Sequence, residues 1–208
     1  GTRTTTTAST STGCSRTRFG GELTTKATTL PELIVIEPKV FQDSRGWFFE
    51  SYSVRNVRPQ GIDVEFVQDN HSYSERKGVI RGLHYQAPPF DQSKLVRCTR
   101  GSVLDVAVDI RHGSPNYAKW FGLVLSADNK KQLFIPKGFA HGFLTLEDGC
   151  EVQYKVDNFY SYEHDRNIRY DDSEIGVEWG VSEPLLSDKD LKAPSLRERG
   201  TDFIWEGR

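Results

Sequence analysis

The 208-residue chain contains no methionine and only three cysteines, Cys14, Cys98 and Cys150. The cysteine count is odd, the spacings are irregular and no Cys-x-x-Cys pair occurs, so no disulfide framework is indicated. Reduced, buried thiols in a cytoplasmic protein are the simplest expectation. No apolar run approaches the ~20 residues of a transmembrane helix, so we expect no membrane partner.

The chain also lacks a large excess of charge of either sign and several well-known loop motifs. The formal net charge is −2 and the basic residues are scattered. Nucleic-acid binding would need a basic stripe, so we expect no nucleic-acid partner, although a small anion could meet a local cationic cluster. The chain has no Gly-x-Gly-x-x-Gly motif, no P-loop and no Gly-x-Ser-x-Gly motif. Nicotinamide-dependent enzymes, nucleotide hydrolases and nucleophile-elbow hydrolases are therefore disfavoured.

The first thirty residues differ from the rest of the chain. They are rich in Thr and Ser, contain Arg3, Arg16 and Arg18, and have one acidic residue, Glu22. Such a composition cannot build a core and resembles an expression leader or a transit segment. We therefore predict a Ser/Thr-rich leader or tag-like segment over 1–30 and a single folded domain over 31–208.

The body of the chain is a succession of short apolar or alternating runs, rich in Val, Ile, Phe and Tyr and separated by Gly, Pro, Asn or Asp. This pattern predicts many short strands, hence an all-β sandwich or barrel. No helical period of useful length lies between them, which disfavours a parallel α/β sheet. Short helices are expected near 52–57 and 189–196. The predicted strands fall within 33–41, 64–70, 78–86, 94–110, 121–127, 131–146 and 150–160.

Alternation assigns the faces of two predicted strands, because successive side chains point to opposite sides. In 103–110 the even-numbered residues are all aliphatic and share one face, whereas Asp105 and Asp109 share the other with Val103 and Ala107. In 151–156, Tyr154 shares the inward face with Val152 and Val156. A buried tyrosine hydroxyl needs a partner, and a backbone carbonyl is the simplest one.

Two of the five histidines, His84 and His141, lie in or beside predicted strands. A metal site is one interpretation, but His84 lacks the second histidine and the following carboxylate of a β-barrel metal motif. Two buried structural histidines are a second interpretation. Acid–base chemistry is the third, because Arg81, Lys94 and Tyr154 are on nearby strands. A histidine could take a proton beside a carbonyl, a tyrosine could return one, and cations could hold the enolate.

From about residue 33 to 197 the chain strongly resembles the dTDP-4-dehydrorhamnose 3,5-epimerase family. The matching segments, in the family's order and at similar spacing, are EPKVFQDSRGWFFESY, FVQDNHSYS, VIRGLHYQ, KLVRC, VLDVAVDIR, QLFIPKGFAHGFLTL, YKVDNFY and LLSDKD. The resemblance implies a cupin jelly roll that forms a homodimer and uses neither cofactor nor metal. It implies inversion of C3 and C5 of dTDP-4-dehydro-6-deoxy-D-glucose, giving dTDP-4-dehydro-L-rhamnose, in dTDP-L-rhamnose synthesis.

The resemblance also assigns individual residues. It makes His84 the general base, oriented by Asp190; Tyr154 the general acid; and Lys94 the cation that stabilises the enolate oxygen. The implied substrate-binding residues are Arg45, Glu50, Gln68, Asp69, Asn70, Arg81, His141, Tyr160, which stacks on the base, Asp165 and Lys189. Trp47, Phe48 and Phe49 are expected in the core instead.

Two positions depart from the family pattern. Asp165 stands where the family commonly has glutamate, and Asn167 where it commonly has glycine. The aspartate is one methylene shorter, so its contact with the nucleotide is expected to weaken or to be bridged by water. Strict alternation also puts Arg81 and His84 on opposite faces although both are assigned to one site, so we expect a bulge at Gly82.

Three alternatives stay open from the sequence. One is a mono-epimerase or ketoisomerase acting on a related dTDP-ketosugar. Another is a non-catalytic sugar-nucleotide-binding cupin, which would not need the full set of His84, Lys94, Tyr154 and Asp190. The last is a metal-dependent cupin oxygenase.

Overall fold

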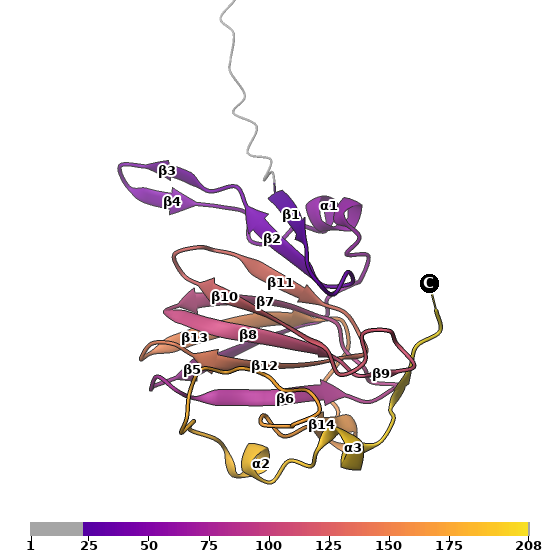
Figure 1. Ribbon diagram of the computed structural model, residues 1–208. Coiled ribbons are helices and arrows are strands. Elements are labelled where there is room, and N and C mark those ends of the chain that lie inside the picture. Colours follow the sequence, from indigo (N-terminus) through magenta and orange to yellow (C-terminus); the bar gives the residue numbers. More distant parts are fainter. Residues whose placement is uncertain (1–22, 208) are drawn as a thin grey trace, which may run out of the picture.

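The computed structural model describes residues 23–207, which form two antiparallel sheets packed face to face (Figure 1). The six-stranded sheet has the order β1 (Leu23–Ala27), β2 (Ile34–Pro38), β11 (Gln132–Ile135), β7 (Lys94–Arg100), β13 (Cys150–Val156), β5 (Gln68–Ser74). The five-stranded sheet has the order β10 (Trp120–Ser126), β8 (Ser102–Asp109), β12 (Phe139–Thr145), β6 (Ile80–Gln86), β14 (Asp165–Asn167). Most neighbours in these sheets are distant in sequence, as in a cupin-like jelly roll, which confirms the predicted fold class.

Two apolar clusters lie on the two faces of the five-stranded sheet. The inner cluster fills the space between the sheets and includes Val103 and Ala107 of β8. The outer cluster includes Val106 and Val108 of the same strand. The alternation assigned these residues to opposite faces correctly, and both faces of β8 are buried, so this strand has no solvent-facing side.

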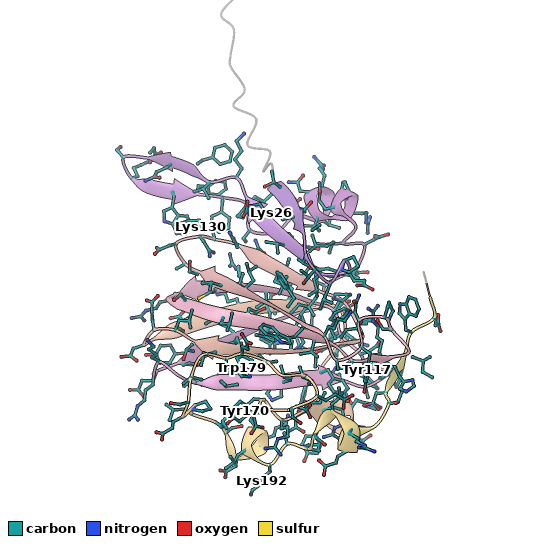
Figure 2. All side chains as sticks on the ribbon, in the orientation of Figure 1. Lys26, Tyr117, Lys130, Tyr170, Trp179 and Lys192 are labelled. Atoms are coloured by element: carbon teal, nitrogen blue, oxygen red, sulfur yellow. The ribbon has the colours of Figure 1, made fainter. Side chains whose placement is uncertain are left out.

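The outer cluster is covered by the segment that follows β14. Trp179 is buried there and its indole Nε1 donates a hydrogen bond of 2.8 Å to the Tyr170 carbonyl; both residues are labelled in Figure 2. The segment ends in two short helices, α2 (Asp188–Leu191) and α3 (Leu196–Arg199), separated by Pro194. One helix was predicted over 189–196, but a proline in a helix interior removes a hydrogen bond and clashes with the preceding turn.

The remaining elements are short. The predicted helix near 52–57 is present as α1 (Val54–Val57), which is followed by a 3₁₀ turn, Arg58–Gln60. A second 3₁₀ turn, Tyr162–His164, precedes β14. Near the C-terminal end, β15 (Phe203–Ile204) pairs in parallel with β9 (Arg111–His112).

The fold extends into the segment for which a leader was predicted. Residues 23–27 form β1, which pairs with β2, and the Leu30 side chain is buried in the inner cluster. The Thr-rich composition of the first thirty residues concealed this short strand, since alternating Leu23, Thr25 and Ala27 suffice for an edge strand. The folded domain thus begins before residue 31, and the interpretation of residues 1–22 lies outside the described residues.

A hairpin of β3 (Phe41–Asp43) and β4 (Gly46–Phe48) projects from the body beside β2 (Figure 1). Trp47 and Phe48 are 58% and 57% exposed, so the prediction that they belong to the core is wrong for this chain. Lys130, labelled in Figure 2, lies beneath the hairpin with Nζ 4.7 Å from the centroid of the Trp47 ring. An exposed aromatic pair of this kind typically marks a contact surface.

Two of the three cysteines lie in the described part of the chain. Cys98 and Cys150 are buried free thiols, as predicted, and burial raises the pKa of Cys98 to about 12. Cys14 lies outside the described residues. None of the helices within residues 23–207 has the length and apolar character needed to cross a bilayer.

Candidate active site

A bulge on β6 brings two predicted site residues to the same face. In the β6–β12 ladder Arg81 pairs with Phe143 and His84 with His141, so three steps on β6 match two on β12. Gly82 is the extra residue and has φ +130°, a backbone conformation that favours glycine. Leu83 and Tyr85 then face the outer cluster while Arg81 and His84 face the inner side. The predicted bulge at Gly82 is confirmed.

The His84 ring is held by a carboxylate. Its Nε2 lies 2.5 Å from Asp190 Oδ1, across 106 positions of sequence, and the Ser187 hydroxyl donates to Asp190 Oδ2 at 2.9 Å. Burial pushes the pKa of Asp190 upward, but the hydrogen bonds from His84 and Ser187 outweigh it and lower that pKa below its usual value. An ionised carboxylate can only accept, so the shared proton belongs to Nε2 and Nδ1 is left with its lone pair. His84 is thus oriented as a base.

Lys94 and Tyr154 come from the opposite sheet. The Lys94 ammonium donates to the His84 carbonyl at 3.3 Å and lies 5.8 Å from the Tyr154 ring centroid. Burial lowers the pKa of Lys94 to about 8, partly opposed by the nearby Asp105 and Asp165 carboxylates. A cation held in so dry a place interacts strongly with any anion that forms beside it.

Tyr154 is partly buried against the inner cluster, as its alternation predicted. Within residues 23–207 no hydrogen bond engages its hydroxyl, so the alternative of a core tyrosine tied to a backbone carbonyl lacks that carbonyl. Burial raises the pKa of Tyr154, which keeps the phenol protonated at neutral pH. The side chain is therefore available as a proton donor.

His141 forms a second buried pair. Its Nε2 lies 2.7 Å from Oδ1 of Asp105, which is completely buried. Burial lowers the pKa of His141 despite the neighbouring carboxylate. The other oxygen of Asp105, Oδ2, has no hydrogen-bond partner among the described residues. A buried polar oxygen without a partner is costly, so the His141–Asp105 contact is the one polar contact that the described residues give this carboxyl group.

These residues line one continuous cleft between the sheets. A cavity of about 440 Å³ is lined by Arg81, His141 and Asp190, and a second of about 430 Å³ by Gln68, Tyr160 and Lys189. Both are also lined by His84, Lys94 and Tyr154. The acid–base residues therefore lie where the two compartments meet. Across residues 23–207, no group of three or more His, Cys, Asp and Glu side chains is placed to hold a metal ion.

The second compartment is lined by five of the predicted substrate-binding residues: Gln68, Asn70, Tyr160, Asp165 and Lys189. Gln68 Nε2 donates to Asn70 Oδ1 at 3.0 Å, and the Tyr160 amide donates to Gln68 Oε1 at 3.4 Å. Asp165 Oδ2 accepts from the Tyr160 hydroxyl at 3.2 Å and from Lys189 Nζ at 2.5 Å. Tyr160 itself is 56% exposed, so the face of its ring can receive a planar ligand.

Three predicted site residues are not brought to this cleft within one chain. Arg45, on the β3–β4 hairpin, forms an exposed ion pair with Asp43, and Glu50 bonds to Asn56. Asp69 faces outward from the six-stranded sheet, opposite to Gln68 and Asn70, and pairs with Lys155 at 2.9 Å. None of the three lines a cavity that His84 lines.

Sequence reasoning missed three residues that support the site. Alternation puts Asp105 on the same face as Val103 and Ala107 but gives it no role, although a carboxylate between two apolar residues needs a partner. Ser187 caps α2 by accepting from the Asp190 amide at 3.1 Å, and the Ser-x-x-Asp spacing is the signal that could have found it. Ser74, which accepts from Arg81 Nε at 3.1 Å, leaves no comparable signal.

The fold and cleft together define a jelly-roll protein with a set of acid–base side chains facing an open pocket. The chain belongs to the dTDP-4-dehydrorhamnose 3,5-epimerase family, whose model matches residues 27–198. The epimerase of that name from Shigella flexneri is 56% identical over 165 residues, which cover 79% of this chain and 91% of that protein.

Two solved structures are informative for the pocket. An epimerase from Legionella pneumophila, in complex with dTDP-4-keto-L-rhamnose, is 42% identical, with a TM-score of 0.86 over 89% of this chain and all of that one. A 3'-monoepimerase from Streptomyces bikiniensis, in complex with dTDP-quinovose, is 31% identical, with a TM-score of 0.77 over 83% of this chain and 89% of that one. The fold is therefore similar to that of enzymes that differ in the number of centres they invert.

Proposed function

We propose that this chain is a cofactor-independent epimerase that inverts C3 and C5 of dTDP-4-dehydro-6-deoxy-D-glucose to give dTDP-4-dehydro-L-rhamnose, in dTDP-L-rhamnose synthesis. The observation that carries the proposal is the placement of His84 and Tyr154 on opposite sheets across one cleft, with Lys94 between them. The names and ligands of the similar proteins support the substrate.

The reaction follows from this geometry. The ketone at C4 acidifies the hydrogens at C3 and C5, and Nδ1 of His84 takes one of them while Asp190 stabilises the imidazolium. Electron density moves to the C4 oxygen, where the Lys94 ammonium meets the developing enolate in a nearly dry environment. Tyr154 returns a proton from the other sheet, so the proton arrives on the face opposite to the one that lost it. Repetition at the second carbon completes the double inversion.

The decisive experiment counts exchanged protons. The protein is incubated with dTDP-4-dehydro-6-deoxy-D-glucose in D₂O and the sugar is followed by NMR. The proposal predicts one deuteron at C3, one at C5 and the L-configured product. Exchange with His84→Ala at a rate near that of the unaltered chain would show that the base is another residue.

The runner-up function is mono-epimerisation or ketoisomerisation of a related dTDP-ketosugar, which the likeness to the Streptomyces 3'-monoepimerase favours. The same NMR experiment separates the two, because a mono-epimerase leaves a product with only one inverted centre. A non-catalytic sugar-nucleotide-binding protein would exchange neither hydrogen. Metal-dependent cupin chemistry would be shown by turnover that EDTA abolishes and added metal restores.

We also propose that the chain works in the cytoplasm as a homodimer in which the β3–β4 hairpin contacts a second copy. The hairpin projects from the body, exposes Trp47, and carries Arg45 away from its own cleft. A neighbouring chain that accepts the hairpin would bury the indole and bring Arg45 and Glu50 to a substrate. Sedimentation of Trp47→Glu tests this: we expect monomers, whereas Val124→Glu, which charges an exposed position on β10, should leave dimers intact.

A further inference from the structure

Helix α2 carries Asp190 but has no apolar anchor. Of its four residues only Asp190 is buried, and Leu191 is 67% exposed. Most short helices in proteins are positioned by burying an apolar face. The position of α2, and with it the contact between Asp190 and His84, must therefore depend on polar contacts.

Several of these contacts are local and cannot place the helix against the sheet. The Ser187 hydroxyl caps the first turn, and the Ala193 amide donates to the Asp190 carbonyl at 3.2 Å. Upstream, Leu185 exchanges backbone hydrogen bonds with Gly78 and Ile80, which sets where the segment arrives. None of these contacts fixes the rotation of α2 about its own axis.

Besides the pair with His84, two side-chain contacts reach α2 from β14. Asn167 Nδ2 donates to the Lys189 carbonyl at 3.0 Å, and the Lys189 ammonium pairs with Asp165 at 2.5 Å. Lys189 immediately precedes Asp190. A bond to its carbonyl therefore constrains the very peptide that leads into the catalytic carboxylate.

The orientation of the Asn167 amide is itself fixed. Arg199 donates from Nη2 to Asn167 Oδ1 at 3.0 Å and from Nε to the Asn167 carbonyl at 3.1 Å. Arg199 belongs to α3, which is anchored by the buried Leu196 and a capping box at Ser195. Since a guanidinium can only donate, the amide oxygen must face Arg199 and the NH₂ group must face α2.

The register of β14 against β6 brings Asn167 next to the base. Asn167 lies directly opposite His84 in the β14–β6 ladder. His84, Asp190, Lys189 and Asn167 thus form a closed ring of contacts that joins the base-bearing strand to the carboxylate-bearing helix. We propose that Asn167 is a positioning residue that holds Asp190 on His84. The inference rests on the proposed epimerase function. A glycine, the residue expected at this position from the family resemblance, has no side chain and could not make the contacts with Lys189 and Arg199.

The test is a double-mutant cycle between Asn167→Ala and Asp190→Asn, with kcat, KM and dTDP affinity measured for each variant. Misplacing a catalytic group by about 1 Å typically lowers the rate ~100-fold. We expect Asn167→Ala to lower kcat roughly 10- to 100-fold and to change the dTDP Kd by less than about twofold. In the Asp190→Asn background the same substitution should change kcat by less than about twofold, because the residue on which Asn167 acts is gone.

Two further variants keep the experiment decisive. Asn167→Asp keeps the shape and the Arg199 contact but replaces the NH₂ donor by a carboxylate oxygen, which cannot donate to the Lys189 carbonyl and repels it. This variant therefore tests the bond between Asn167 and α2 if Asn167→Ala fails to fold. Asn129→Ala removes a similar amide, whose Nδ2 bonds to the Val124 carbonyl at 2.9 Å in a distant turn, and should leave kcat unchanged. A kcat like that of the unaltered chain in both Asn167 variants, or equal losses in both backgrounds, would overturn the proposal.

Failure of this inference is distinguishable from failure of the proposed function. The proton between His84 and Asp190 should give a low-field NMR resonance that does not depend on any substrate. We expect it in the unaltered chain and in Asn129→Ala, and its loss in Asn167→Asp. If turnover is absent but this pattern holds, the positioning role survives and the substrate is wrong; if the resonance persists in Asn167→Asp, the positioning role is wrong.

Discussion

Replacing Gly82 by alanine should test how the site is built. A Cβ at this position would lie 2.5 Å from the Gly142 Cα and 2.8 Å from the His141 carbonyl oxygen. Both neighbours are backbone atoms, so no side-chain rotation can relieve the contact. The residue also has φ +130°, which an alanine adopts only with strain. The strands β6 and β12 must therefore separate or the bulge must change its register.

The expected loss of stability in Gly82→Ala has two contributions. Overpacking costs about 1–3 kcal/mol, and an unfavourable backbone conformation costs about 1–3 kcal/mol. A total of about 4 kcal/mol would lower the Tm of a domain of this size by roughly 8–16 °C. Turnover measured well below that temperature should fall as well, because a register change moves Arg81 and His84 apart.

Calorimetry of Gly82→Ala should be compared with that of Gly113→Ala. Gly113 also has a positive φ, +86°, but a Cβ there meets nothing within 4 Å, so this control isolates the backbone term. We expect the control to lose about 1 kcal/mol. Melting temperatures within about 2 °C of each other would refute the argument, because the two positions would then differ by less than about 1 kcal/mol.

Four further predictions follow from the structure. His84→Ala and Tyr154→Phe should each abolish double inversion in the NMR assay, with exchange at the first centre surviving only in Tyr154→Phe. Lys94→Met should lower kcat by roughly 10²–10³-fold, since it removes the enolate's cation. Burial holds the pKa of Lys94 near 8 rather than 10.5, so the unfolded chain binds more protons between these values. The free energy of unfolding should then rise with pH from about 8 to 10.5 by up to about 3 kcal/mol relative to Lys94→Met in denaturant titrations. Cys98 and Cys150 should resist alkylation in the native protein and react on unfolding, because both thiols are buried and the pKa of Cys98 is about 12.

Alternation predicted the sheets well because it reports burial directly. Residues 103–110 are apolar on one face and mixed on the other, and both faces are buried in the structure. Prediction was weaker where a local exception decided the outcome. Pro194 divided one expected helix into two, and a single strand, Leu23–Ala27, was concealed by the Thr-rich segment around it.

The site could be predicted only in part from the residues themselves. The presence of His84, Lys94 and Tyr154 on nearby predicted strands indicated acid–base chemistry, but the contact of His84 with Asp190 spans 106 positions and leaves no local pattern. The family resemblance supplied that pairing. Trp47 and Phe48 were assigned to the core by their hydrophobicity, yet hydrophobicity alone does not say whether the apolar partner belongs to the same chain.

The β3–β4 hairpin has a genetic consequence. If Arg45 serves the cleft of a second chain, a chain lacking its base and a chain lacking its arginine can repair one another. Mixing His84→Ala with Arg45→Ala chains, each inactive alone, would restore about a quarter of the sites, since half the dimers are mixed and each holds one intact cleft. Such interallelic complementation would make the functional unit of this sequence the pair, not the polypeptide.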